Sequence, residues 1–180
     1  MKPRGPLMIE HRLIEKMFYL AEKEVDMMMR NSEVDPVFID TMVDFVRTYA
    51  DRTHHGKEED ILFRDLEKKE MNDEDTVMMQ ELVDEHVYAR NVTGDLVNAK
   101  DRYLDGDQEA LPVIIEKLNT LIKFYPEHIR KEDKVFFPNT ETYFSKDELD
   151  SMLDEFWEFD KNMIHEKYQK LIDTLSSRYE

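Results

Sequence analysis

Histidine and glutamate side chains recur at fixed spacings in this sequence, on segments that otherwise carry apolar residues. His54 is followed four residues later by Glu58. The same spacing joins His128 to Glu132. Side chains four residues apart lie on one face of a helix. Burying imidazoles and carboxylates is unfavourable unless they are paired, hydrogen-bonded or bound to a metal. The pattern therefore predicts either satisfied polar groups in a core or a metal site.

These pairs belong to an internal repeat. Residues 54–63 align without gaps with residues 128–137, and both copies read His-x-x-Lys-Glu-acidic-x-β-branched-x-Phe. A Glu-His pair lies upstream in each copy, and it supplies His11 in the first half and His86 in the second. Two copies indicate duplicated helical hairpins rather than a solenoid, which needs three or more repeats.

The second expected helix offers two His-x-x-x-Glu pairs. His54 with Glu58 is one, and the neighbouring His55 with Glu59 has the same spacing. Only His54 and Glu58 have counterparts in the second copy, and they continue the apolar face that contains Ala50. Neighbouring residues of an α-helix point about 100° apart, so we expect His55 to point aside. His55 and Glu59 are then neighbours or partners of the ligands, or part of a solvated face.

Four imidazoles and two carboxylates exceed what one catalytic metal ion with an open position requires. Imidazole and carboxylate without thiolate suit iron, with manganese and zinc as alternatives. We expect two metal ions, each held by two histidines of one hairpin and bridged by both glutamates. Positions left open would accept an oxo or hydroxo bridge and a small ligand. The predicted metal ligands are His11, His54, Glu58, His86, His128 and Glu132.

Composition restricts the remaining choices. A length of 180 residues predicts one domain. Cysteine is absent, which excludes disulfides, iron–sulfur clusters and a thiol nucleophile. The formal net charge of −17 argues against nucleic acid and against an anionic membrane surface as partners. The sequence has neither an apolar run of about 18 residues nor a signal peptide pattern, so we expect a cytoplasmic protein without a membrane span.

Apolar residues spaced by three and four predict helices along the whole chain. The expected helices cover about residues 7–31, 36–69, 74–103, 111–137 and a fifth segment after 147. We predict an all-α fold, an antiparallel up-down four-helix bundle over residues 7–138. Residues 1–6 form a lead-in, and residues 139–180 form an extension with an additional C-terminal helix. Pro126 is expected to kink the fourth helix and Pro138 to end it.

The order of these motifs on successive helices resembles the hemerythrin-like, or HHE cation-binding, family. The Lys-Glu-acidic runs of both copies resemble its signature, and the resemblance covers about residues 7–138. It implies a four-helix bundle with a non-heme di-iron centre bridged by two carboxylates. It also implies binding of oxygen, nitric oxide or peroxide for sensing, storage or detoxification.

Two positions depart from the oxygen-carrying members of that family. Those proteins place two histidines four residues apart on the third helix, where this chain has Arg90 in the second position. Their fourth helix uses His-x-x-x-x-Asp, whereas here Glu132 comes one residue earlier and Asp133 stands at the carrier spacing. Arg90 cannot ligate because it stays protonated. We expect it either in a surface or interhelical salt bridge or in contact with a group that supports a metal ligand. Without the further histidine, the two ions should have nearly equivalent ligand sets and more open coordination positions. This argues against reversible oxygen carriage by the mechanism of the oxygen carriers.

Three functions fit these observations. The leading one is a di-iron protein that binds oxygen or a related small ligand. The alternatives are a di-iron oxidoreductase that consumes peroxide, oxygen or nitric oxide, and a regulatory module whose metal occupancy controls a partner. Phe156, Trp157 and Phe159 on the last helix are expected to cap the bundle or to form a dimer or partner surface. Tyr125, one turn before His128, is expected to pack in the core or to hydrogen-bond a ligand.

Overall fold

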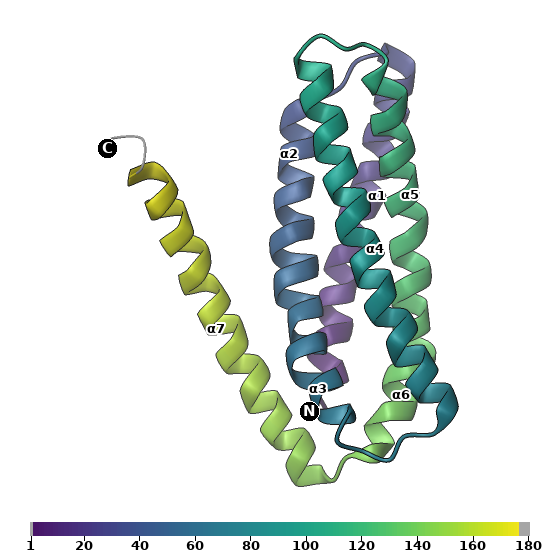
Figure 1. The fold of residues 1–180 in the computed structure, drawn as a ribbon, viewed down its shortest axis with the longest axis vertical. Coiled ribbons are helices and arrows are strands. Elements are labelled where there is room, and N and C mark those ends of the chain that lie inside the picture. Colours follow the sequence, from purple (N-terminus) through teal and green to yellow (C-terminus); the bar gives the residue numbers. More distant parts are fainter. Residues whose placement is uncertain (1, 177–180) are drawn as a thin grey trace.

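The chain folds into a bundle of long helices. The computed structural model describes residues 2–176, and beyond Met163 it describes the side chain of Lys167 alone. Over this range the protein is all-helical, which confirms the predicted class. Figure 1 shows three long helices side by side with a fourth helical rod: α1 (Arg4–Asn31), α4 (Asp73–Leu104), α5 (Ala110–Lys131) and the rod that begins with α2 (Pro36–Phe45). None of the described helices combines the length and the apolar character of a membrane span.

Two of the rods change helix type near one end of the bundle. The second rod continues from α2 through η1 (Val46–His55) and η2 (Glu58–Phe63) to α3 (Arg64–Leu66). The fourth rod continues from α5 through η3 (Glu132–Phe136), α6 (Phe137–Thr140) and the 3₁₀ turn η4 (Glu141–Tyr143). Segments η1, η2 and η3 are π-helical. Such wide turns are uncommon and often accompany functional sites.

The breaks between rods coincide with capping residues. Asp35 caps α2 by accepting hydrogen bonds from the backbone N–H groups of Val37 and Phe38. Asn72 caps α4 by accepting from the N–H of Asp75. Such caps satisfy donors that have no partner inside the helix, and they fix where each rod begins.

Two predicted boundaries are wrong, both at prolines. Helix α1 begins at Arg4 and includes Pro6 of the expected lead-in. The fourth rod does not end at Pro138, because α6 continues to Thr140. Pro6 lies in the first turn of α1, where its missing N–H would have no partner anyway. Pro138 instead directly follows the π-helical segment η3 inside a continuous rod. Pro126 lies inside α5, and its kink stays a prediction.

The core consists of two apolar clusters separated by a polar layer. On α1, His11 stands between Leu7 of one cluster and Ile14 of the other. The same order of apolar, polar and apolar residues recurs on the other three rods. The two clusters position the polar layer and exclude bulk water from its two sides.

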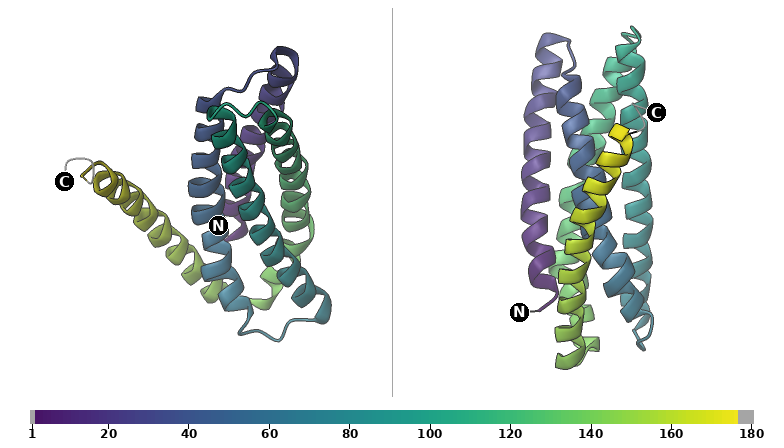
Figure 2. Two further views of the ribbon diagram at one scale, coloured as in Figure 1. Left: turned by 45° about the horizontal axis from the view of Figure 1, so that its top comes forward. Right: turned by 90° about the vertical axis from the view of Figure 1, so that its left-hand side faces the viewer.

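Helix α7 (Lys146–Ser176) leans away from the bundle (Figures 1 and 2). Its first turns contact the bundle, where Met152 and Phe156 are buried in the cluster at that end. Trp157, by contrast, is 61% exposed. The start of α7 therefore caps the bundle, and the partner surface expected on this helix stays a prediction.

Candidate metal centre

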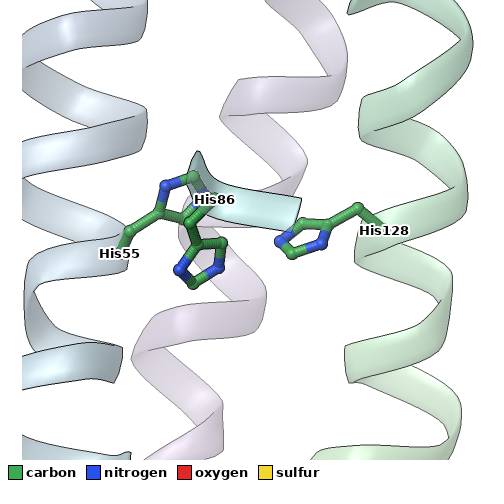
Figure 3. A group of neighbouring side chains, drawn as sticks. All are labelled: His55, His86 and His128. Carbon is green, nitrogen blue, oxygen red and sulfur yellow. The ribbon is translucent and has the colours of Figure 1, made fainter. Parts of the chain in front are cut away.

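The polar layer brings together five histidines and two glutamates, each at most 2% exposed. All six predicted ligands are among them, and His55 is the seventh. Their ligand atoms form two groups, and within each group these atoms lie within 4.8 Å of one another. The mixed group consists of His11, His54, Glu58 and Glu132. The histidine group consists of His55, His86 and His128, which point toward one another from three rods (Figure 3).

Each glutamate faces both groups. One oxygen of Glu58 lies 3.4 Å from Nε2 of His54, and the other lies 3.5 Å from Nε2 of His86. Glu132 repeats this arrangement, with its oxygens 3.1 and 3.2 Å from the Nε2 atoms of the histidines on the first and fourth rods. Two carboxylates that each contact a histidine of both groups stand where bridging ligands would stand between two ions.

The other ring nitrogen of each histidine, Nδ1, faces a carboxylate on the outside of the layer. His54 donates from Nδ1 to Glu10 at 2.9 Å. The equivalent bond in the second copy runs from His128 to Glu85 at 2.7 Å. Both acceptors are the glutamates of the repeated Glu-His pairs, which explains why glutamate precedes histidine in each copy.

A second pair of bonds holds the histidines of α1 and α4. His86 donates from Nδ1 to Glu59 at 2.6 Å. His11 donates to Asp133 at 2.8 Å. Glu59 and Asp133 are the aligned acidic residues of the repeat, and for Glu59 the predicted partner role is confirmed. Because a carboxylate only accepts, Nδ1 carries a hydrogen, and Nε2, which faces into the layer, is the ring atom that would bind a metal.

The inward-facing atoms have no hydrogen-bond partners among the described residues. These atoms are Nε2 of all five histidines and both oxygens of Glu58 and of Glu132. A buried polar atom without a hydrogen-bond partner is costly. A neutral imidazole Nε2 and a carboxylate oxygen are both metal-ligand atoms. The residues present therefore fit a centre that holds metal cations.

A model of the hemerythrin HHE cation-binding domain matches residues 6–140. The chain belongs to this family. A comparison with curated proteins finds no match. The matched range ends at Thr140, within α6, so helix α7 lies outside the part of the chain that the family describes.

In this HHE domain the repeated lysines hold the outer carboxylates. The Nζ of Lys131 lies 2.6 Å from Glu85. In the first copy Lys57 forms the same ion pair with Glu10. Lys57 is fully buried, and its Nζ also lies 2.8 Å from Asp160 of α7. The repeated motif thus describes two layers, the inward-facing residues and the charged groups that orient them.

His55 corrects the sequence analysis. It is 1% exposed, which excludes the expected solvated face, and its ring stacks on that of His86 with centroids 3.8 Å apart. The expectation assumed an α-helix, but His55 ends the π-helical segment η1. A π turn holds more than the 3.6 residues of an α turn, so His54 and His55 are rotated less than 100° apart and both reach the layer. The two adjacent histidines in the sequence could have indicated that His55 also belongs to the layer. Comparison with the second copy argued against it, because that copy has Ile129 at the aligned position.

Without a bound metal ion, the neighbouring charged groups and burial give the histidine rings unequal pKa values. Burial alone would lower the pKa of His11, but its bond to Asp133 and the nearby Glu132 raise it to about 9. Burial opposes the same effect of Glu132 on His128, whose pKa is raised to about 10. For His54, burial and the neighbouring His11 lower the pKa to about 4. Two of the rings therefore hold a proton at neutral pH that a metal ion would displace.

The two inward-facing glutamates also differ. Burial and the facing Glu132 raise the pKa of Glu58 well above its usual range. Burial acts on Glu132 in the same sense, but His128 and His11 outweigh it and lower the pKa of that carboxyl well below its usual range. A metal cation between the two carboxylates would favour the ionised form of both.

Arg90 occupies the position at which oxygen carriers have a further histidine. It donates to Asp51 and to Glu59, both at 2.7 Å, which confirms the predicted interhelical salt bridge. Glu59 in turn accepts from His86, so Arg90 supports that histidine through one carboxylate. With His55 present, the histidine group has three members despite the arginine.

Tyr125 combines both of its expected features. Its ring is buried and stacks on Phe18, with centroids 4.1 Å apart. Its hydroxyl group is also buried, and within the described part of the chain it has no hydrogen-bond partner. Burial, chiefly, raises the pKa of Tyr125 far above its usual range, so the hydroxyl keeps its proton.

Proposed function

We propose that this protein is a non-heme di-iron protein, built as an antiparallel up-down four-helix bundle, that binds oxygen, nitric oxide or peroxide for sensing, storage or detoxification. The observation that carries the proposal is the convergence in one buried layer of five Nε2 atoms and two carboxylates whose atoms have no hydrogen-bond partner within the described part of the chain. Two groups of ligand atoms and two carboxylates between them favour two ions over one. Nitrogen and oxygen ligands without sulfur suit iron, with manganese and zinc as alternatives.

The chain's own residues would bind and orient this centre. Bound iron would supply redox chemistry and open coordination positions for a small ligand. Glu58 and Glu132 would join the two groups, and the outer carboxylates would keep each Nε2 free of hydrogen by accepting from Nδ1. The apolar clusters on either side of the layer would restrict the access of water.

A metal-gated regulatory module is the second candidate, because one chain of contacts joins the centre to α7. His54 donates to Glu10, Glu10 pairs with Lys57, and Lys57 pairs with Asp160. A change at His54 would reach α7 through these contacts. Trp157 on the exposed side of α7 would then belong to a dimer or partner surface.

Elemental analysis after iron reconstitution tests the leading proposal. We expect saturation at two iron ions per chain. Saturation at one ion, or none, would contradict the dinuclear centre. Exposure of the loaded protein to oxygen, nitric oxide or peroxide then separates reversible binding from turnover, which would favour the oxidoreductase alternative. An iron-dependent change in oligomeric state would favour the regulatory module.

A further inference from the structure

Helix α7 packs against the two residues that separate the histidines of η1 from Glu58. It comes so close to Gly56 that a Cβ atom there would meet the ring of Phe159. The next residue, Lys57, is fully buried, and its Nζ lies 5.9 Å from the centroid of the Phe156 ring. The family match ends before α7 begins. A segment outside the matched domain thus contacts the stretch of chain that carries three of the seven inward-facing residues.

Asp160 of α7 completes the pairing of the buried ammonium group. The Nζ of Lys57 lies 2.8 Å from Oδ1 of Asp160 and also pairs with Glu10. Glu10 in turn accepts from Nδ1 of His54 at 2.9 Å. Burying an ammonium group is costly unless it is paired, and here two carboxylates share it. In their charged forms the three groups carry one net negative charge beside the centre, which favours a bound cation.

The second copy obtains the equivalent carboxylate from its own helix. There Lys131 pairs with Glu85 at 2.6 Å and with Glu81, one turn earlier in α4, at 3.4 Å. When the repeated Glu-His pairs are aligned, Pro6 is the counterpart of Glu81. Proline has no carboxylate, so α1 cannot supply the second acceptor for the lysine of the first copy. Asp160 supplies it from a distant part of the chain.

We propose that Asp160 is a positioning residue of the metal centre, which acts through Lys57 on the carboxylate that orients His54. Without the charge of Asp160, Glu10 alone would balance the ammonium group and would accept more weakly from Nδ1 of His54. The ring would then be a weaker ligand, because an outer acceptor raises the basicity of a metal-binding histidine. This inference rests on the proposed metal centre and assigns α7 a part in building it.

Equilibrium binding of ferrous iron without oxygen, measured in competition with a chromogenic chelator, tests the proposal. Removal of a group that orients a metal-binding histidine lowers the metal affinity by about ten- to a hundredfold. Asp160 acts one step further from the ring, so in Asp160→Asn we expect the Kd of the more weakly bound ion to rise by roughly tenfold. Glu158→Gln makes the same charge change at an exposed site of α7 and should leave this Kd unchanged.

A double variant separates action through Lys57 from general damage to α7. Once Lys57 is replaced, the charge of Asp160 has no ammonium group to hold. The combination of Lys57→Met with Asp160→Asn should therefore bind iron as Lys57→Met alone does. Asp160→Glu keeps the charge and should recover most of the affinity that Asp160→Asn loses.

The hydrogen bond of His54 gives a readout that does not depend on iron. In chelated, ¹⁵N-labelled protein, the Nδ1–H resonance of His54 should move upfield in Asp160→Asn, because the bond to Glu10 weakens. The same resonance of His128, whose acceptor is Glu85, should stay in place and serves as the internal control.

Three results would overturn the inference. An iron Kd and a His54 resonance that respond no more to Asp160→Asn than to Glu158→Gln would exclude the positioning role and leave the proposed centre standing. A further loss of affinity in the double variant would show that Asp160 acts by another route. Failure of the parent protein to bind iron would overturn both proposals, because Asp160 would have no centre to support.

Discussion

The two copies of the repeat orient the histidines of the centre with the same contacts, but different parts of the chain cover the two copies. In each copy a glutamate accepts from a histidine and pairs with a lysine. In the first copy Lys57 is fully buried and pairs with α7 through Asp160. In the second copy the side chain of Lys131 is 27% exposed and pairs with Glu81 instead. The residues shared by the two copies thus provide and orient the ligands, whereas the residues that differ between the copies determine which groups surround the centre.

The aligned positions that differ lie on one side of the centre. The first copy has His55 where the second has Ile129, and Asp51 where the second has Tyr125. His55, Asp51 and Tyr125 all line a cavity of about 300 Å³ between η1 and α4. One side of the ligand layer is therefore covered by α7, and another side lies next to this cavity.

Metal removal should have the largest effect, because both copies contribute ligands. Without metal, the Nε2 atoms of five histidines and the oxygens of two glutamates have no hydrogen-bond partner among the residues that the structure describes. A ligand at hundredfold excess over its Kd stabilises the native state by about 2.7 kcal/mol. We expect iron-loaded protein to melt well above chelated protein in calorimetry. Coincident melting curves would contradict the account.

The affinity for metal should rise with pH. The pKa values of about 9 for His11 and about 10 for His128 lie above neutrality, so without metal both rings hold a proton at pH 7. His54, with a pKa of about 4, is already neutral there. Metal binding must displace these two protons and any that Glu58 holds, because the pKa of that carboxyl is also raised. The apparent affinity should therefore fall by roughly a hundredfold or more per unit as pH decreases from 8 to 6.

Calorimetric titrations in buffers of different ionisation enthalpy count these protons directly. Release of about two protons or more per chain at pH 7 is the expected result, two from His11 and His128 and the remainder from Glu58. A value near zero would mean that the two rings are neutral before metal binds, and that the difference from His54 is absent.

Substitution of the two aligned lysines should give unequal losses of stability. Lys57→Met leaves Glu10 and Asp160 without their buried cation, and breaking such a pair costs about 3 kcal/mol. Lys131→Met removes a partly exposed pair and should cost about 1 kcal/mol or less. Urea unfolding of both variants, each saturated with iron, measures the difference. Equal losses would mean that the cover by α7 does not distinguish the two copies.

The sequence predicts the helices and the duplicated ligands because both depend on local spacing. Apolar periodicity locates the rods to within a few residues, and the alignment of the copies selects six of the seven residues that the structure brings together. The sequence does not predict the orientation of His55, because that orientation depends on the π-helical turn of η1, which residue spacing does not reveal. The contact of Lys57 with Asp160 cannot be predicted from the sequence either. It joins segments about a hundred residues apart, and only tertiary packing brings them together.

The smallest expected effect concerns the contact between Gly56 and α7. A Cβ atom at Gly56 would lie 2.7 Å from the ring of Phe159, so Gly56→Ala must shift that ring or the part of α7 that carries it. Alanine favours the helix by up to about 1 kcal/mol, so the net change in stability should be below that value. Trp157 is the single tryptophan, and its fluorescence should change. The aligned Arg130→Ala, at an exposed position, should leave it unchanged.

Anomalous diffraction at the iron edge, from crystals of the iron-loaded protein, tests the central claim most directly. That claim is a two-ion centre built by the duplicated ligands together with His55. The account predicts two iron peaks, one within bonding distance of His11 and His54 and the other within bonding distance of His55, His86 and His128, with both glutamates between them. A single peak, or a second ion that His55 does not touch, would contradict it.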